Sequence, residues 1–267
     1  MGVGTTLLWE RGGAGEPLVL LHGMGSSHDD FAGLRGRLEA SYDVLAADLP
    51  GHGGSPSLIE EPTVGAITDV VEADLDTLGL SRVHVLGNSL GARVGLELAR
   101  RHRARSVVAI APSGMSMPLE RVYQGSVLSV ARVVLQRVRP VIEPLSRVRL
   151  GRALLLGGLR ARPLRATREE ALAVRDGFAD SDDFWRTLWS AILTDRPTGL
   201  GDVDCPVILA QGLFDGVSGG QTVRYVPAVP GARFELLLGA GHAPQSDTPD
   251  DIVRLVDEAA ARSTTPP

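Results

Sequence analysis

Residues 85–95, VLGNSLGARVG, mark a switch from a strand pattern to a helix pattern. The apolar run at 83–87 is typical of a short buried strand. Beyond it, apolar residues recur at helical spacing from Leu90 to Leu98. Ser89 stands at the switch, between Gly87 and Gly91. The pattern predicts a sharp strand-to-helix turn that presents the serine hydroxyl at the carboxyl end of a strand.

The five residues 87–91, GNSLG, match G-x-S-x-G, the sequence of a nucleophile elbow. A serine on so tight a turn adopts a strained backbone, and the two glycines let the flanking chain segments approach closely. The amide of Leu90, at the start of the helix, would face a developing oxyanion. In a chain with 32 glycines a motif with three fixed positions can arise by chance. The assignment therefore depends on whether a base and an orienting carboxylate follow in the chain.

Apolar runs alternate with amphipathic helical patterns along the chain, which predicts an α/β fold: a mostly parallel sheet with helices on both faces. A further, amino-terminal strand is expected at 5–10. The other strands are expected at 18–22, 42–47, 83–87, 107–111, 207–211 and 234–238, and the helices at 27–40, 63–78, 90–102 and 250–262.

The alternation breaks between residues 113 and 200, where helical patterns occur without a convincing strand. A structureless loop of that length is uncommon in a compact domain, so a helical insertion is expected there. The predicted organisation is a core formed by residues 1–112 and 201–267 and a helical cap formed by residues 113–200.

Composition narrows the class of protein. The 267 residues are 43% hydrophobic and carry a net charge of −5, which fits a large globular domain and argues against nucleic-acid binding. No apolar stretch is long enough to span a membrane, and no signal peptide precedes the first strand, so a cytoplasmic protein is expected. The single cysteine, Cys205, excludes an internal disulfide and a cysteine-rich metal site.

A nucleophilic serine needs a base, and the base needs a carboxylate that orients it. Asp215 follows the predicted strand at 207–211, in QGLFDGVS, and His242 follows the strand at 234–238, in LLGAGHAPQSDTP. The chain order is therefore Ser, Asp, His, with each residue at the carboxyl end of a predicted strand.

Five ordered segments now resemble the α/β-hydrolase superfamily: LLHGMGSSHDDF, DLPGHGGS, GNSLG, GLFD and GAGHAP. The resemblance covers nearly the whole chain. It implies that Ser89 is the nucleophile, His242 the general base and Asp215 the orienting acid. The amides of Met24 and Leu90 would form the oxyanion hole, with no metal or organic cofactor. The serine argues against the branches in which an aspartate forms the ester intermediate.

Other residues have competing interpretations. His22 is expected to support the oxyanion loop or line the pocket, and His52 to be structural or pocket-lining. Trp185 and Trp189, one helical turn apart, would line the pocket or pack within the cap. Asp247 and Asp250 are expected to cap the last helix.

Arginines are concentrated in the predicted cap: residues 115–168 hold eleven of them and two acids. On the helical pattern at 119–139, Arg121, Arg132 and Arg139 share one face, and Tyr123, Val127, Val130 and Val134 share the opposite face. A solvated face, or one packed on the acidic core, is favoured over an anionic substrate, a CoA or carrier-protein thioester, or an anionic membrane.

These observations predict a serine hydrolase acting by acyl-enzyme chemistry on a small to medium, largely apolar carboxylic ester or thioester. Two alternatives stay open: a C–C bond hydrolase of diketone-type substrates that uses the same triad, and a ligand-binding receptor or scaffold with little turnover. The expected partner is a small-molecule substrate, for which an acyl-CoA or carrier-protein thioester is one candidate. The protein is expected to be a monomer or a homodimer.

Overall fold

The structure is a computed structural model that describes residues 6–264. Its centre is a seven-stranded sheet with the order β1-β3-β2-β4-β5-β6-β7. The strand bounds are β1 (Trp9–Gly13), β2 (Glu16–Leu21), β3 (Tyr42–Ala47), β4 (Val83–Asn88), β5 (Ala104–Ile110), β6 (Val207–Gly212) and β7 (Arg233–Leu237). Only β1 runs antiparallel to its neighbour, so the predicted fold class is confirmed.

The first strand differs from the sequence prediction. Residue 5 lies outside the described residues, and β1 begins only at Trp9, near the end of the expected range 5–10, and continues to Gly13. Leu7 is buried, but the polar side chain of Asp74 accepts hydrogen bonds from the amides of Thr6 and Leu7. These amides are therefore bonded to a helix side chain, and pairing with β3 starts only at Trp9, opposite Ala47.

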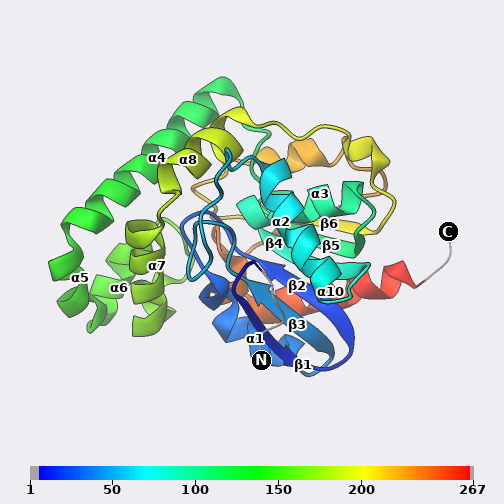
Figure 1. The fold of residues 1–267 in the computed structure, drawn as a ribbon. Coiled ribbons are helices and arrows are strands. Elements are labelled where there is room, and N and C mark those ends of the chain that lie inside the picture. The colour runs from blue at the N-terminus through cyan, green and yellow to red at the C-terminus, as the bar shows by residue number, and fades with distance from the viewer. Residues whose placement is uncertain (1–5, 265–267) are drawn as a thin grey trace.

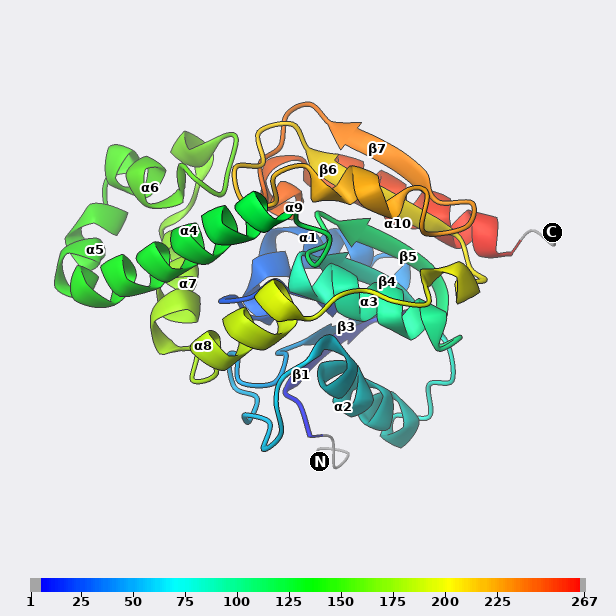
Figure 2. The same cartoon turned by 90° about the horizontal axis from the view of Figure 1, so that it is seen from above.

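Helices cover both faces of the sheet (Figures 1 and 2). α2 (Val64–Thr77) and α3 (Leu90–Arg100) bury their apolar stripes on one face, and α1 (Ala32–Leu38) and α10 (Pro249–Ser263) bury theirs on the other. Two separate clusters of buried side chains result, one on each side of the sheet. This packing fixes the carboxyl ends of the central strands, where the candidate site lies.

A helical insertion, residues 118–194, lies between β5 and β6 and projects to one side of the sheet in both views (Figures 1 and 2). It contains α4 (Pro118–Arg137), α5 (Arg139–Ser146), α6 (Arg149–Leu156), α7 (Arg168–Asp180), α8 (Phe184–Thr187) and a π-helical segment (Leu188–Thr194). Among residues 6–264, no helix is both long enough and apolar enough to cross a membrane.

The orientation of α4 corrects the prediction for its arginine face. Arg132 is buried within the insertion, where it donates a hydrogen bond to the carbonyl oxygen of Phe178 and lies 5.0 Å from the centre of the Phe184 ring. Val130, predicted on the face opposite the arginines, is 60% exposed. Arg132 turns inward because the last carbonyl groups of α7 have no partner within their own helix and Arg132 satisfies one of them. Arg139, predicted on the same face, begins α5, is 48% exposed and pairs with Asp180.

Candidate active site

The strand-to-helix turn places Ser89 in a strained conformation at the end of β4. Its backbone has φ 53° and ψ −106°, a combination that is rare for a residue other than glycine. The Ser89 amide donates a hydrogen bond to the carbonyl oxygen of Ile110, at 2.8 Å, and the Gly91 amide donates to that of His22, at 3.1 Å. These bonds to two neighbouring segments hold the strained turn in place.

Asp215 follows β6 and accepts hydrogen bonds from both sides of its carboxylate. Oδ1 accepts from the amides of Val217 and Ser218, at 2.8 and 3.0 Å. Oδ2 accepts from Gln211 Nε2 at 2.6 Å and from Ser218 Oγ at 2.5 Å. Burial opposes the charge, but His242 and the Ser218 donors outweigh burial and lower the pKa of Asp215. The carboxylate is therefore fixed and ionised.

His242 lies next to this carboxylate, and its Nδ1 is 3.0 Å from Asp215 Oδ2. Burial by itself would lower the pKa of His242, but the adjacent Asp215 charge and hydrogen bond raise it above its usual value. With Nδ1 as the donor, Nε2 is left free to accept a proton. This is the arrangement in which an imidazole acts as a general base.

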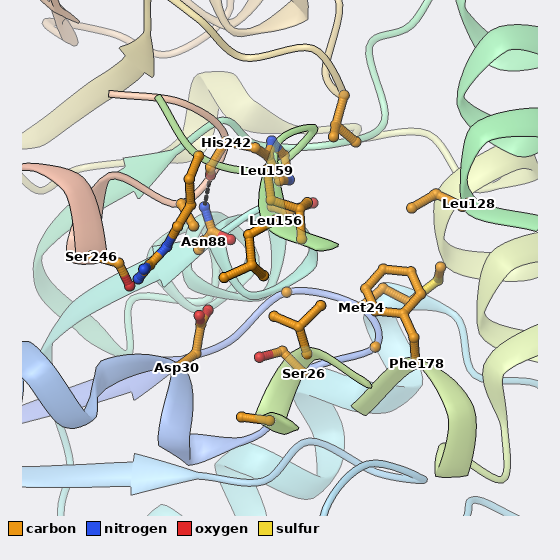
Figure 3. A pocket seen from close by; sticks show the side chains of 18 of the residues that line it. Met24, Ser26, Asp30, Asn88, Leu128, Leu156, Leu159, Phe178, His242 and Ser246 are labelled. Atoms are coloured by element: carbon orange, nitrogen blue, oxygen red, sulfur yellow. Dashed lines mark hydrogen bonds between the residues drawn. The ribbon is translucent and has the colours of Figure 1, made fainter. Parts of the chain in front are cut away.

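The loop that carries His242 is attached to two other parts of the molecule. The Asn88 side chain, next to Ser89, donates to the His242 carbonyl oxygen at 2.9 Å (Figure 3). The His242 amide donates to the carbonyl oxygen of Leu159 in the insertion, at 2.8 Å. Asp247 accepts from the amides of Gly241, Ala161 and Arg162, at 2.9, 2.8 and 3.2 Å. Asp247 thus bridges the insertion and the histidine loop, and α10 begins after Thr248 instead.

The loop after β2 passes directly against the elbow. A Cβ atom placed on Gly23 would lie 3.3 Å from the Cβ of Ser89, so the next amide, that of Met24, is close to the serine. Within the described residues, the amides of Met24 and Leu90 donate no hydrogen bond to another protein group. Two unpartnered amides beside a serine can stabilise an oxyanion.

His22 and His52 are buried under this loop and are absent from the walls of the cavity described below. His22 Nδ1 donates to the Gly23 carbonyl oxygen at 2.7 Å, while Nε2 accepts from the Leu49 amide at 2.9 Å. Burial, reinforced by the neighbouring His52, lowers the pKa of His22 to about 3. Their pocket-lining alternative does not match the structure, because both rings pack under the loop instead of facing the cavity.

The two tryptophans predicted to line the pocket also lie elsewhere. Trp185 in α8 is 49% exposed and packs edge-on against Phe184. Trp189, in the π-helical segment that follows, is 63% exposed. Neither lines the cavity or is buried within the insertion. The buried face of this segment is formed by Phe184, Leu188 and Ile192 instead, and the tryptophans lie on the outer side.

Ser89 and His242 line one cavity between the core and the insertion (Figure 3). It measures about 1110 Å³, including the part that opens to solvent. Its apolar walls come largely from the insertion, with Leu128, Leu156, Leu159, Val174, Phe178 and Ile192. No hydrogen bond joins Ser89 and His242 in the described part of the chain. Such contacts often tighten only when substrate binds.

Several polar residues of the site were not predicted from the sequence. Gln211 and Ser218 hold Asp215, and a polar residue at the end of an apolar strand, in QGLFDGVS, was an available signal for Gln211. Asp30 lies within the segment LLHGMGSSHDDF, but its sequence pattern gave no sign that it faces a cavity. Arg160 and Glu170 form an ion pair in the cavity wall that only the folded structure reveals. Within residues 6–264, no group of three or more His, Cys, Asp or Glu side chains is arranged to hold a metal ion.

Comparison with known proteins identifies the family of the chain. Residues 18–255 match the model of the alpha/beta hydrolase family. A relative from Pseudomonas putida, the dihydrolipoyllysine-residue acetyltransferase component of an acetoin cleaving system, is 34% identical over 185 residues, or 65% of this chain. The match covers 49% of that relative, so the chain spans about half of its length.

Two further similarities extend over nearly the whole chain. A 2-hydroxy-6-oxononadienedioate/2-hydroxy-6-oxononatrienedioate hydrolase from Cupriavidus pinatubonensis is 27% identical, with 92% of this chain and 87% of the relative covered. The crystal structure of an enol-lactonase from Burkholderia xenovorans superposes with a TM-score of 0.74, 19% identity and coverage of 96% of each chain. At that identity, the structural similarity concerns the fold.

Proposed function

Because the chain belongs to the alpha/beta hydrolase family, we propose that it is a serine hydrolase acting on a small to medium, largely apolar carboxylic ester or thioester. The observation that carries the proposal is the hydrogen bond between His242 and Asp215 in a cavity that Ser89 also lines. We assign residues 113–200 as a cap over this cavity and residues 1–112 and 201–267 as the core.

The chemistry proceeds in two steps of acyl transfer. Ser89 Oγ attacks the carbonyl carbon while His242 Nε2 takes the hydroxyl proton, and Asp215 stabilises the imidazolium that forms. The amides of Met24 and Leu90 bind the oxyanion of the tetrahedral intermediate. The imidazolium then protonates the leaving alcohol or thiol. In the second step His242 removes a proton from water, which attacks the acyl-enzyme, and the acid is released with Ser89 regenerated.

The ester or thioester assignment is supported by the walls of the cavity. Aliphatic and aromatic side chains from α4, α6 and α7 surround the space in front of Ser89, which suits an apolar acyl chain. A CoA or carrier-protein thioester would place its acyl group here and its carrier outside the cavity. The opening of the cavity would then limit which leaving groups bind, and the enclosed space would limit the size of the acyl group.

The C–C hydrolase alternative is less well supported by the charges in the cavity. The Cupriavidus relative is named for a dioate, which carries two carboxylates. The single arginine among the residues that line this cavity, Arg160, is already paired with Glu170. Incubation with a vinylogous diketone, followed by product analysis, distinguishes C–C cleavage from ester hydrolysis. Exclusive C–C products would replace the ester proposal.

The test of the proposal is intact-mass spectrometry after treatment with a fluorophosphonate, for the unmodified protein and for Ser89→Ala. We expect one adduct, mapped to Ser89 by peptide sequencing, and no adduct on the variant. Hydrolysis of p-nitrophenyl esters of increasing chain length, measured in parallel, should follow the same dependence on Ser89. Folded protein that neither labels nor hydrolyses any ester would contradict the proposal and favour a ligand-binding role.

A further inference from the structure

One end of the cavity is polar, although most of its walls are apolar. Asp30, from the short helical turn His28–Phe31, lies there with Arg160, Glu170 and Ser246. Figure 3 shows the Asp30 carboxylate pointing into the cavity, toward the side on which Asn88 and Ser246 lie. The mechanism proposed above uses none of these four residues, so their presence in the wall needs a separate explanation.

Arg160 is not available to bind an anionic ligand. Its side chain is only 7% exposed, and its two terminal nitrogens donate to the two oxygens of Glu170 at 2.8 and 2.7 Å. Burial opposes the charge of Glu170, but the hydrogen bonds from Arg160 outweigh it and lower the pKa of Glu170. The pair is therefore ionised and neutral overall, and each member already has its counter-ion.

In the part of the chain that the structure describes, only one of the two carboxylate oxygens of Asp30 has a hydrogen-bond donor in contact. Its Oδ2 accepts a hydrogen bond from Gln245 Nε2 at 2.8 Å, and the Gln245 side chain is itself buried. Among the described residues, no donor contacts the other oxygen, Oδ1. Burial raises the pKa of Asp30 to about 6 against the opposing effects of Gln245, Arg160 and His242. Near neutral pH this carboxylate is ionised, and no charged partner contacts it within residues 6–264.

We propose that this end of the cavity is a specificity subsite, in which Asp30 accepts a hydrogen bond from an uncharged donor on the acyl chain, such as a hydroxyl, and repels a second carboxylate. The inference rests on the proposed function, since it assigns the acyl side of the same cavity. A hydroxyl gives Oδ1 the partner that it lacks, whereas a carboxylate meets a like charge and finds Arg160 already paired. The selected substrates are therefore neutral hydroxyacyl esters.

The test compares three p-nitrophenyl esters of equal chain length: hexanoate, 6-hydroxyhexanoate and the monoester of adipate. We expect kcat/KM for the adipate monoester to be at least about tenfold below that for hexanoate, because like charges repel strongly in a partly enclosed cavity. The kcat/KM value for the 6-hydroxy ester should exceed that for hexanoate, because its hydroxyl donates a hydrogen bond to Asp30, and a value no higher than that for hexanoate would overturn the hydroxyl assignment. Equal kcat/KM values for adipate and hexanoate would overturn the subsite.

Two variants assign the effect to Asp30. Asp30→Asn keeps the shape and an acceptor but removes the charge, so it should raise the adipate-to-hexanoate ratio by about tenfold. Asp30→Leu removes the acceptor and should lower the ratio of 6-hydroxyhexanoate to hexanoate. Asp182→Asn removes an exposed acid of the insertion outside the cavity lining and should leave both ratios unchanged. An unchanged adipate ratio in Asp30→Asn would overturn the proposal.

A measurement on the unmodified protein covers the case in which a variant fails to fold. Rejection of the adipate ester should weaken between about pH 8 and about pH 5.5, as Asp30 takes up a proton. The charges of Arg160, Glu170 and His242 also affect the pKa of Asp30. Because hydrolysis of both esters requires neutral His242, the ratio of their kcat/KM values cancels that requirement. Fluorophosphonate labelling of the same samples separates the two proposals: a labelled Ser89 without discrimination overturns only the subsite, and an unlabelled serine overturns both.

Discussion

The side-chain amide of Asn88 donates a hydrogen bond to the backbone carbonyl oxygen of His242, 2.9 Å away. Residues 154 positions apart in the chain are thereby joined directly, one of them adjacent to the proposed nucleophile and the other the proposed base. Asn88 is buried, so the bond is protected from competition with water. It fixes the histidine loop relative to the elbow and explains why a polar residue ends the apolar strand β4.

Asn88→Ala should lower kcat for ester hydrolysis by roughly 10- to 100-fold, because small displacements of a general base are costly. The free energy of unfolding should fall by about 1–2 kcal/mol through the unpaired carbonyl group. Both are measurable, by steady-state kinetics and by urea unfolding. Gln136→Ala is the matched control, since it removes an amide bonded to the Ala179 carbonyl oxygen away from the cavity. A kcat unchanged from that of the unmodified protein would show that the bond does not position His242.

Gly91 is required by the close approach of two backbones. A Cβ atom on Gly91 would overlap the carbonyl oxygen of Leu21, which cannot move without disrupting β2. Gly91→Ala should therefore lower the free energy of unfolding by on the order of 3 kcal/mol. Gly36→Ala in α1 is the control, because no atom lies within 4 Å of a Cβ there. That control should be neutral or raise stability by up to about 1 kcal/mol. Equal effects in thermal unfolding would contradict the steric argument.

The elbow and the sheet were predictable because local sequence determines both. Glycines on either side of a serine, between an apolar run and a helical stripe, leave few alternatives to the turn observed at Ser89. Each central parallel strand is buried on both faces and is therefore largely apolar in sequence. The strands from β2 to β7 accordingly appear close to the predicted positions.

The orientation of α4 and the polar end of the cavity were not predictable in the same way. An amphipathic pattern separates two faces but does not say which one is buried, and Arg132 lies inside because α7 presents an unpaired carbonyl group there. Asp30 meets Gln245, 215 positions later, only after the chain has folded. Contacts of that sequence separation leave no local periodicity that a sequence pattern could detect.

The pH dependence of hydrolysis should follow His242. A protonated imidazole cannot accept the serine proton, so kcat/KM should fall as the pH drops through the pKa of this residue. Since Asp215 raises that pKa above the usual value of about 6.5, the midpoint should lie above 6.5. Asp215→Asn should move the midpoint down and reduce kcat by about 10³- to 10⁴-fold. A midpoint that stays in place in Asp215→Asn would mean that another group controls the profile.

Asp247 connects the insertion to the histidine loop, and its removal should affect stability and activity together. Asp247→Ala leaves the buried amide of Gly241 and the part-buried amides of Ala161 and Arg162 without their acceptor. The free energy of unfolding should fall by roughly 2–4 kcal/mol, and kcat should fall because Gly241 precedes the base.

Asp250→Ala is the control for this change. Asp250 lies in the first turn of α10, is 88% exposed and pairs with Arg37 at the surface, so its loss should cost less than about 1 kcal/mol. Urea unfolding and ester kinetics on both variants distinguish the two roles. If both substitutions had the same small effect, the Asp247 bridge would contribute nothing to holding the histidine loop against the insertion, and the position of that loop would depend on the hydrogen bonds to the Leu159 carbonyl oxygen.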